Sequence, residues 1–502
     1  MKRSVGFTYS LDKFGHSSSF QIALEAWRRG LTVTFINDVR RYRISSGKNT
    51  HFFSGSALID DDLCLKAARI CQNKADTKKY LYRNNVVVPK GKQFGPSYSN
   101  EEIINFAQSF GFPLVLKPTF GYQGKGVFTN IRDSASLKEY LINVRNKLNF
   151  KDIIIEERIE GDDLRIFVIG NKVVSVVKRV PANIMGNGVH SIKKLISIKN
   201  LERKNNIMLR KAPIVIDKEV ISSLRSIGYN LNGIPKKGEK IFLRDKCNVS
   251  AGGDPLDITE DIPDNVKLIA INAVKAVPGL QHGGVDVLYK ADNPDEPCVV
   301  IEINSYAMIC GHLYPLEGKP REAIADLIDY YFPESIPKKG KNKNLFFDFN
   351  DIRTLLFDQK QFGGILSNNI LTKVTLTPPA TNKVVAKEII VSGKVQCVGF
   401  RSSLQKEAVK LNLFGFVEYI KEKVKIVVAG NEENVKSFTE LCKTGPANAR
   451  VEDVCLTETN KPVYLGFHIK LKNWDYLVFE MKIILRAFKQ RVNFYIKQKD
   501  IY

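Results

Sequence analysis

Two short segments in the middle of the chain have the pattern of strands and carry carboxylates. This feature limits the possible folds more than any other part of the sequence. GGVDVLY (283–289) and VVIEIN (299–304) are predicted to be neighbouring strands of one sheet. Glu302 and Asn304 are two residues apart and therefore point to the same face, where Asp286 can join them. Three such oxygen ligands suit Mg²⁺, which binds a few carboxylates together with phosphate oxygens and water. The alternative is that they are only the outward polar positions of a half-exposed sheet.

A glycine-rich turn follows a strand that ends in a lysine. Lys117 closes the apolar strand PLVLKP, and the loop TFGYQGKG (119–126) follows directly. A lysine at a strand end, beside free backbone N–H groups, can hold and cover phosphates. The loop lacks the spacing of a P-loop, and glycine-rich hairpins are usually no more than hairpins, so both interpretations stay open.

Composition sets wider limits. The chain has 502 residues, 44% of them hydrophobic, which allows about three domains. Its 76 Lys and Arg residues exceed its 53 Asp and Glu residues, which favours acidic partners but does not choose among nucleotides, anionic peptides, nucleic acid and membrane surfaces. No apolar run has the length of a signal peptide or a transmembrane helix, so we predict a cytoplasmic protein. The eight cysteines are scattered without zinc spacing, as reduced thiols are.

Helical and strand periods recur along the chain. The sequence predicts a βαβ-type opening, with strands at 4–10 and 31–36 and a helix at 18–29 between them. The first turn lacks the GxGxxG of a dinucleotide site. The N-terminus of this helix either binds an anion or is only a structural turn. Residues 191–211 are basic and helical in period, as a solvated helix face would be. The last residues, 470–502, form a basic amphipathic helical pattern, which either packs on its own protein or meets a membrane surface or a partner.

The order of these pieces resembles the ATP-grasp ligases over roughly residues 70–333. The chain is similar above all to the ATP-grasp part of cyanophycin synthetases and of bifunctional glutathione synthetases, and more distantly to D-alanine–D-alanine ligases. The matching blocks are NKADTKKYL (73–81), FPLVLKPTFGYQGKGV (112–127), IIIEERIEGDDLRIFVIG (153–170), KRVPANIMGNGVHSI (178–192), IFLRDKCNVSAGGDPLDIT (241–259), GGVDVLY and VIEINSYAMICGHLYPLEGKPR (300–321).

This resemblance implies a binding site for ATP. Two lysines and the glycine-rich loop would hold and cover the phosphates, namely Lys74, Lys117, Gly121, Gly124, Lys125 and Gly126. Glu156, Glu157 and the backbone through Ile159 would line the adenine, and Asp163 would accept hydrogen bonds from the ribose hydroxyls.

The resemblance also implies a metal site and an acceptor site. Asp286, Glu302 and Asn304 would hold magnesium or manganese ions. The catalytic set near the transferred phosphate and the acceptor would be Arg244, Asn248 and Ser250. Ala307 and Met308 stand where the relatives usually carry Pro-Gly, so the acceptor pocket is expected to be reshaped.

The chemistry implied is amide bond formation through an acyl phosphate. A carboxylate is a poor electrophile, so the γ-phosphate is first moved onto it, while Mg²⁺ and the lysines offset the charge that develops. An amine then attacks the carbonyl and expels phosphate. A closed glycine-rich loop would exclude the water that otherwise consumes the intermediate.

The segment VSGKVQCVGFR (391–401) resembles the acylphosphatase signature, in which backbone N–H groups and one arginine cradle a phosphate. The resemblance implies a ferredoxin-like sandwich with Arg401 at the phosphate. Cys397 stands where the loop usually has a glycine, and Tyr419 stands where the family has its water-positioning asparagine. Because a phenol cannot place a water as a carboxamide does, the domain either hydrolyses acyl phosphates or only binds them or packs.

The sequence therefore predicts an α/β and α+β protein in five parts: a short Rossmann-like portion (1–72), an ATP-grasp domain (73–335), a linker that begins in a Pro-, Lys- and Asn-rich stretch (336–385), an acylphosphatase-like α/β sandwich (386–469) and a terminal helix (470–502). The predicted function is an ATP- and Mg²⁺-dependent carboxylate–amine ligase for an amino acid, a peptide or a poly-amino acid. The alternatives are an acylphosphatase and a nucleotide-regulated protein that binds anionic partners. We do not expect nucleic acid as a partner, and homo-oligomerisation stays open.

Overall fold

The structure is a computed structural model that describes residues 18–121, 124–291, 293, 298–362, 372–376, 378–379 and 384–470, without the side chains of residues 357–362. The predicted strand at 4–10 and, apart from Lys470, the predicted terminal helix at 470–502 lie outside the described residues. The chain divides into a first unit of residues 1–26, 31–339 and 349–376, and a second unit of residues 27–30, 340–348 and 377–502. Over the described ranges, no helix is long and apolar enough to cross a membrane.

The first unit begins with an antiparallel sheet in the order β17-β1-β2-β3-β4. Its elements are α1 (Ser18–Arg28), β1 (Thr32–Ile36), β2 (Asp38–Ser45), β3 (Thr50–Ser54), β4 (Ala57–Leu58), α11 (Phe349–Phe362) and β17 (Lys373–Leu376). β1 pairs antiparallel with both β2 and β17, so the described part of the predicted Rossmann-like portion is an antiparallel sheet.

The described part of the predicted linker at 336–385 is folded. Within it, β17 adds an edge strand to β1, and the ring of Phe349 at the start of α11 lies 5.2 Å from that of Phe20 and 5.5 Å from that of Phe35. Phe349, Ile352 and Leu356 are buried at helical spacing. The lysines and asparagines at 338–344, which predict a linker, precede this helix, and the apolar period begins only after them.

A four-stranded sheet in the order β5-β8-β6-β7 carries the glycine-rich loop. Its elements are β5 (Gly91–Phe94), α4 (Asn100–Phe110), β6 (Leu114–Pro118), β7 (Phe128–Ile131), α5 (Ser134–Ile142) and β8 (Ile153–Glu157). Ser99 and Glu102 form a capping box at the start of α4, which fixes where that helix begins. Buried residues of both helices pack on the sheet in one cluster, which holds the strand end at Lys117 in place.

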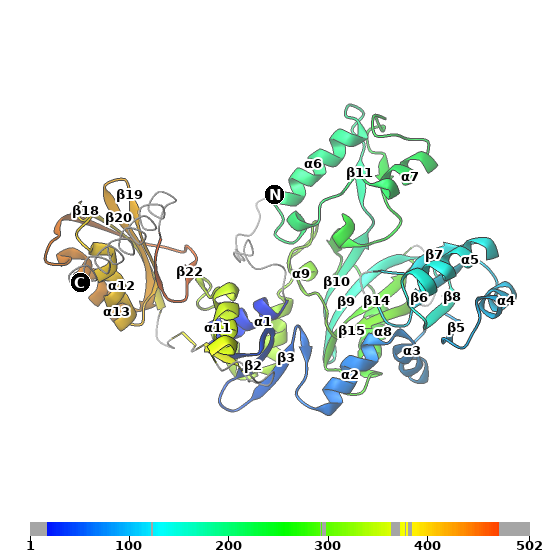
Figure 1. The fold of residues 1–502 in the computed structure, drawn as a ribbon, viewed down its shortest axis with the longest axis horizontal. Helices are drawn as coiled ribbons and strands as arrows, with labels where there is room; N and C mark the ends of the chain where they lie inside the picture. The colour runs from blue at the N-terminus through cyan, green and yellow to red at the C-terminus, as the bar shows by residue number, and fades with distance from the viewer. Residues whose placement is uncertain are drawn as a thin grey trace, which may run out of the picture. The chain divides into compact units, whose positions relative to one another are not determined.

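The central sheet has the order β13-β10-β9-β14-β15 (Figure 1). Its strands are β9 (Asp162–Ile169), β10 (Lys172–Val180), β13 (Asp254–Asp257), β14 (His282–Tyr289) and β15 (Val299–Asn304). Three helices bury its apolar face, namely α2 (Asp62–Gln72), α3 (Lys74–Arg83) and α8 (Asp264–Lys275). The predicted pairing of the two carboxylate strands is confirmed, because Asp286 on β14 lies directly opposite Glu302 on β15.

An insertion between β10 and β13 has a small core of its own. It contains β11 (Asn183–Met185), α6 (Ile192–Lys204), α7 (Lys218–Ser226) and β12 (Lys240–Phe242). The basic segment predicted at 191–211 supplies α6, whose Ile192, Leu195 and Ile196 are buried while most of its lysines face outward. The solvated helix face is therefore the interpretation that fits. After β15, the first unit adds the short α9 (Cys310–Leu313) and α10 (Ala323–Tyr331).

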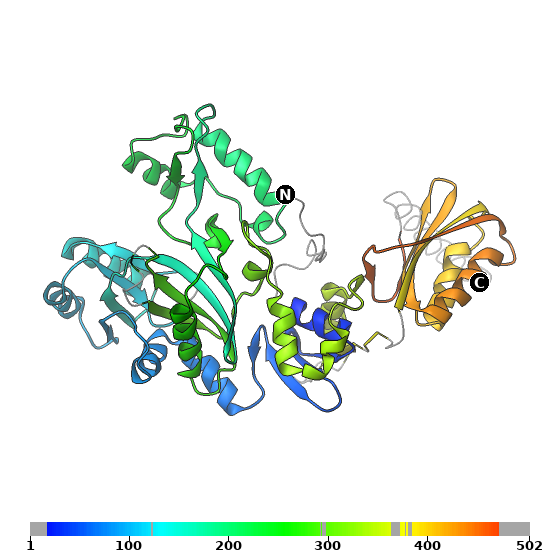
Figure 2. The same cartoon turned by 180° about the vertical axis from the view of Figure 1, so that it is seen from behind.

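The second unit is an antiparallel sheet in the order β21-β18-β20-β19, with β23 added in parallel to β19. Its elements are β16 (Leu345–Phe346), β18 (Val384–Lys394), α12 (Phe400–Lys410), β19 (Phe414–Ile420), β20 (Lys423–Asn431), α13 (Glu432–Thr444), β21 (Arg450–Glu458), β22 (Val463–Tyr464) and β23 (Phe467–Ile469). Both helices pack into one core with the sheet (Figures 1 and 2). The predicted ferredoxin-like sandwich is confirmed.

Candidate active site

The polar face of the central sheet gathers charged side chains from four neighbouring strands. Residues of one register row, Arg165 on β9, Asp286 on β14 and Glu302 on β15, lie directly opposite one another. In the next row Arg179 on β10 lies opposite Asp163 on β9. Residues between them, such as Leu164, Ile166 and Val285, point to the other face and are buried in its apolar core. Strand alternation thus puts these charged residues together on the face opposite α2, α3 and α8.

Two arginines neutralise the buried carboxylate of Asp286. Arg165 donates to both carboxylate oxygens, from Nε to Oδ1 and from Nη2 to Oδ2 at 3.0 Å, and Arg179 Nη2 lies 3.1 Å from Oδ2. Burial alone would raise the pKa of Asp286, whose side chain is 6% exposed, but the two guanidiniums together lower it below its usual range. Asp286 is therefore ionised and already paired.

Asp163, predicted to contact ribose, takes part in the same network. Its Oδ1 accepts from Arg179 Nε at 2.8 Å and from Nη2 at 2.5 Å. Burial raises the pKa of Asp163 and the nearby charge of Asp286 adds to this, while Arg179 opposes the rise. The ribose contact stays a prediction, because the carboxylate that would make it is shared with a guanidinium.

Among the predicted metal ligands, Glu302 and Asn304 have fewer contacts with other side chains than Asp286 has. Glu302 Oε1 lies 3.8 Å from Lys74 Nζ, and the side chain is 30% exposed. Asn304 Nδ2 is buried and has no hydrogen-bond partner among the described residues. Two carboxylates and an amide are the donors that a hard divalent cation prefers, so these residues fit the predicted ion once Asp286 is released by its arginines. The described residues hold no cluster of three or more His, Cys, Asp or Glu side chains that could do so instead.

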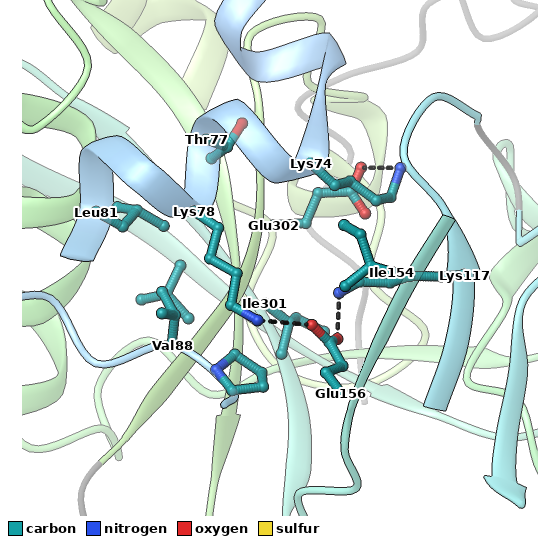
Figure 3. A pocket seen from close by; sticks show the side chains of 12 residues that line it. Lys74, Thr77, Lys78, Leu81, Val88, Lys117, Ile154, Glu156, Ile301 and Glu302 are labelled. Carbon is teal, nitrogen blue, oxygen red and sulfur yellow. Dashed lines mark hydrogen bonds and ion pairs between the residues drawn. The ribbon is translucent and has the colours of Figure 1, made fainter. Parts of the chain in front are cut away.

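A pocket lined by lysines adjoins this face and encloses about 310 Å³ of space, part of it open to solvent (Figure 3). Figure 3 shows Lys78 and Lys117 both reaching Glu156, while Lys74 points to Glu302. Lys78 Nζ lies 3.1 Å from Glu156 Oε2, and Lys117 Nζ forms an ion pair with Oε1. Burial lowers the pKa of Lys78, although Glu156 opposes this. The apolar part of the wall consists of Leu81, Val88, Pro89, Ile154, Val300 and Ile301.

The glycine-rich loop is attached to the start of α3. Lys74 donates from its backbone N–H to Thr119 O at 3.0 Å and from Nζ to Gly121 O at 2.9 Å. Gly124 and Gly126 have φ values of 72° and 73°, in the left-handed region that glycine adopts without strain. Lys125 between them is exposed. The structure therefore brings Lys74, Lys117 and this loop together, as the sequence predicts, while residues 122–123 lie outside the description.

The remaining predicted nucleotide residues surround the end of β8. Glu157 Oε1 accepts from the backbone N–H of Lys90 at 2.7 Å, which ties β8 to the segment before β5. Ile159 follows in the next loop and is half-buried. Glu156, by contrast, lies inside the pocket between two lysines. The structure therefore shows Glu156 as a counter-ion, and an adenine contact for these residues stays a prediction.

The predicted catalytic residues near the acceptor lie in and beside the insertion. Arg244 donates to Asp217 Oδ2 at 2.6 Å and forms an ion pair with Glu219, both at the start of α7. Asn248 Oδ1 accepts from the backbone N–H of Ser250 at 3.1 Å and from its Oγ at 2.8 Å. These contacts hold Arg244 within the insertion and shape the turn at 248–250. A contact with phosphate or acceptor stays a prediction for all three.

The loop before α12 in the second unit departs from a simple anion cradle. The guanidinium carbon of Arg401 lies 3.7 Å from the centre of the Tyr419 ring, so the arginine stacks on the residue that replaces the family's asparagine. Cys397 is exposed and has a φ of 56°, a conformation that glycine would take more easily. Gln396 donates from Nε2 to Lys421 O at 2.5 Å. The loop keeps its arginine and its tight turn but has an aromatic ring beside the site.

Two family models match the chain. The RimK-like ATP-grasp domain matches residues 71–188, and acylphosphatase matches residues 387–469. The chain contains an ATP-grasp domain and an acylphosphatase domain. The first of these includes the glycine-rich loop and β8, and the second includes the loop before α12.

Curated relatives match a larger part of the first unit. Cyanophycin synthetase of Synechocystis sp. is 30% identical over 311 residues, which cover 60% of this chain and 34% of the relative. The bifunctional glutathione biosynthesis protein of Clostridium perfringens is 31% identical over 324 residues, covering 62% and 40%. This chain thus spans less than half the length of either relative. The solved acylphosphatase of Bacillus subtilis is 35% identical, with all of that chain and 18% of this one covered and a TM-score of 0.17.

Three residues of the ATP-grasp region were missed by the sequence analysis. Lys78 follows Lys74 by one helical turn, a spacing that could have placed both on the same side of α3. Arg165 follows Asp163 by two residues on β9, so strand alternation already put both on one face. Arg179 required the pairing of β10 with β9, which the sequence did not supply.

Proposed function

We propose that the protein is an ATP- and Mg²⁺-dependent carboxylate–amine ligase that works through an acyl phosphate, on an amino acid, a peptide or a poly-amino acid. The observation that carries this is the junction of two sites in one unit. The lysine-lined pocket and the carboxylate face meet at Lys74 and Glu302, whose charged atoms lie 3.8 Å apart. A nucleotide in the pocket would thus have its phosphates at the carboxylates.

The pocket supports nucleotide binding by the chemistry of its walls. Apolar side chains such as Leu81, Val88 and Ile154 suit the faces of a purine, and the lysines suit its phosphates. Glu156 pairs with Lys78 and Lys117 and holds both in position, and phosphate oxygens would take over as their partners. The loop attached to Lys74 would cover the phosphates from the other side.

Glu302 and Asn304, joined by Asp286, would hold the divalent cation. When bound there, it supplies charge that screens the phosphate oxygens from an incoming carboxylate. The lysines position the γ-phosphate and offset the charge that spreads over its oxygens in the transition state. The carboxylate oxygen then forms a bond to phosphorus as the bond to the ADP oxygen breaks, which gives an acyl phosphate.

The second half of the reaction is attack by an amine. Its nitrogen forms a bond to the acyl carbon, phosphate leaves with the electron pair of the broken C–O bond, and a proton is lost from the nitrogen. The chain's own contribution is to hold the acyl phosphate away from water under the glycine-rich loop. The names of the curated relatives, cyanophycin synthetase and glutathione biosynthesis protein, support amide formation between amino acids as the reaction class.

The test is product analysis with the purified full chain. The protein is incubated with ATP, Mg²⁺ and pools of amino acids, short peptides and polyanionic acceptors, and ADP release and new masses are recorded. The proposal predicts ADP and an amide product from at least one pool. If no pool yields a product or accelerates phosphate release, the ligase function is wrong.

For the acylphosphatase domain we propose anion binding without efficient hydrolysis. The observation that favours this is the stacking of Arg401 on Tyr419, because the ring occupies the position from which an amide would orient water. The test is hydrolysis of benzoyl phosphate by the wild-type chain and by Arg401→Ala. Equal, background rates with weaker binding in the variant are expected, and efficient hydrolysis that is lost in the variant would show an active acylphosphatase instead.

A further inference from the structure

Asp286 is the most buried of the three carboxylates on the polar face, and guanidinium groups take both of its oxygens. Arg165 contacts Oδ1 and Oδ2, and Arg179 contacts Oδ2. A divalent cation needs at least one of these oxygens if Asp286 is to be its ligand. At least one guanidinium must then give up its hold on the carboxylate.

The two arginines differ in what else they bind. Arg179 also donates to Asp163 through Nε and Nη2, so it keeps a carboxylate partner if it loses Asp286. The described hydrogen bonds of Arg165 all go to Asp286. If a cation bound Asp286, Arg165 would therefore lose the partner of all its described hydrogen bonds, whereas Arg179 would keep Asp163.

Charge balance sharpens this difference. The carboxylates of Asp163 and Asp286 are matched by the guanidiniums of Arg165 and Arg179, and Glu302 is matched by Lys74, so acidic and basic side chains are equal in number as they stand. A divalent cation at Asp286 would add positive charge within a few ångströms of two guanidiniums, in a partly buried site where such repulsion is strong. Binding becomes favourable when an anion joins and takes Arg165 as its partner.

We infer that Arg165 is an exchangeable counter-ion of Asp286: a divalent cation displaces its guanidinium, which then binds a carboxylate oxygen of the substrate. The inference rests on the proposed function for the nature of that anion. It makes Arg165 a substrate-binding residue in addition to those predicted. It also predicts that cation binding and substrate binding depend on each other.

The residue beside Arg165 leaves room for this movement. Gly284 lies on β14, and a Cβ atom there would stand 3.0 Å from Arg165 Cδ and 3.2 Å from Nη1. The Arg165 side chain is 17% exposed, so its guanidinium lies within reach of the open face. A methyl group at position 284 would press on the arginine stem and weaken its hold on Asp286.

The experiment measures Mn²⁺ binding to the full chain without nucleotide, by the electron paramagnetic resonance signal of free Mn²⁺. Arg165→Met keeps the aliphatic stem but removes the charge, and we expect it to bind Mn²⁺ at least about tenfold more tightly than the wild type. Arg165→Lys should stay close to the wild type. Lys178→Met is the matched control. Lys178 Nζ pairs with Asp162 Oδ2 at 2.6 Å, between the same strands β10 and β9 that carry Arg179 and Asp163. Lys178 and Asp162 each precede one of these two residues in the sequence.

Two further variants locate the ion and guard against misfolding. Asp286→Asn added to Arg165→Met should abolish the gain, since it removes the proposed ligand. Gly284→Ala leaves every charge in place and should tighten Mn²⁺ binding in the same direction by a smaller factor. Thermal unfolding of each variant shows whether it is folded.

The inference is overturned if folded Arg165→Met or Gly284→Ala binds Mn²⁺ no more tightly than the wild type, or if the gain persists in Asp286→Asn. It is also overturned if Lys178→Met gives the same gain, because the effect would then be one of general charge. None of these measurements needs a substrate. A ligase that forms product but shows no gain would refute only the exchange, whereas a gain without any product would refute only the ligase function.

Discussion

The polar face of the central sheet and the loop before α12 both present an arginine where an anion is expected, but the partners of these arginines differ. Arg165 is paired with the carboxylate of Asp286, and Arg401 is stacked on the ring of Tyr419. A carboxylate can be taken over by a cation, which leaves the guanidinium for a substrate. An aromatic ring offers no such exchange and cannot orient water.

The two regions also differ in how many of the residues expected from the family resemblance are present. In the ATP-grasp region the predicted phosphate lysines Lys74 and Lys117 meet in one pocket, and the predicted metal ligands lie on one sheet face. The charged ones each have a partner of opposite charge. In the acylphosphatase domain the fold and the arginine are kept, while two neighbouring positions, Cys397 and Tyr419, have changed. We therefore propose a reaction for the first region and binding for the second.

The largest effect is expected at Lys117. Lys117→Met removes the charge that reaches Glu156 in the pocket, so ligation should fall by about 10³-fold if this lysine offsets charge on the transferred phosphate. The measurement is the rate of ADP release with a substrate pool that yields product. Lys138→Met, on the exposed side of α5, is the control and should keep the wild-type rate. A Lys117→Met variant with most of its activity would remove the first region from the chemistry.

The second effect concerns the acylphosphatase domain. Tyr419→Asn supplies the amide that the family carries, and we expect the rate of benzoyl phosphate hydrolysis to rise by about 10²-fold. Tyr419→Phe keeps the ring under Arg401 and serves as the control. If hydrolysis stays at background in the asparagine variant although phosphate still binds, the turn at Cys397 and not the ring limits this site.

A third prediction compares a buried carboxylate that lies between two lysines, Glu156, with a less buried one, Glu388. Glu156→Gln leaves Lys78 and Lys117 without their carboxylate, and we expect the free energy of local opening at β6 and β8 to drop by about 3 kcal/mol. Glu388→Gln in the second unit removes the partner of Lys425 and of the more exposed Lys461, and should cost less than about 1 kcal/mol. Hydrogen exchange of each sheet measures both values. Equal losses would mean that the pocket charges are as well solvated as those around Glu388.

The last prediction is a pH dependence in the first unit. His282 is buried, with Nδ1 2.7 Å from Tyr331 Oη and Nε2 2.6 Å from Ser56 O. Because a carbonyl only accepts, Nε2 carries the proton and Nδ1 accepts from the tyrosine. Burial lowers the pKa of His282 to about 4 from its ordinary 6.5, and the Ser56 carbonyl only partly opposes this.

The sign follows from the proton count. Between pH 6.5 and about 4 the unfolded chain binds a proton that the folded chain does not, so stability is lost as the pH falls through this window. Unfolding of the wild type and of His282→Gln at a series of pH values tests this. The variant should be less stable at neutral pH but should lose less on acidification, and equal slopes would show that His282 is not the group concerned.

Much of this arrangement could be predicted from the sequence, because strand alternation and the order of the motifs are local properties. The pairing of Asp286 with Glu302 and the lysine near the end of β6 followed from such patterns. The two-helix sandwich was implied by the resemblance of residues 391–401 to acylphosphatases. What could not be predicted depends on contacts between distant segments. The pairing of β17 with β1 joins residues more than three hundred positions apart, and the Arg179 contacts require the register of β10 on β9.

The acylphosphatase domain shows the same limit at the level of one residue. The sequence indicated that Tyr419 replaces an asparagine, but only the structure shows the ring beneath Arg401. In the ATP-grasp region, likewise, Glu156 was predicted as part of the adenine site and is found between two lysines. Motif positions predict which residues meet, whereas the protonation and pairing of those residues follow from burial.

The central claim is that the first unit activates a carboxylate by moving the γ-phosphate of ATP onto it. The direct measurement uses acids labelled in the carboxylate with a heavy oxygen isotope, together with ATP, Mg²⁺ and an amine pool, and follows the released phosphate by phosphorus NMR. An acyl-phosphate intermediate predicts ADP, an amide product and phosphate that carries one labelled oxygen from the acid. An amide formed with unlabelled phosphate, or with AMP and pyrophosphate, would contradict it.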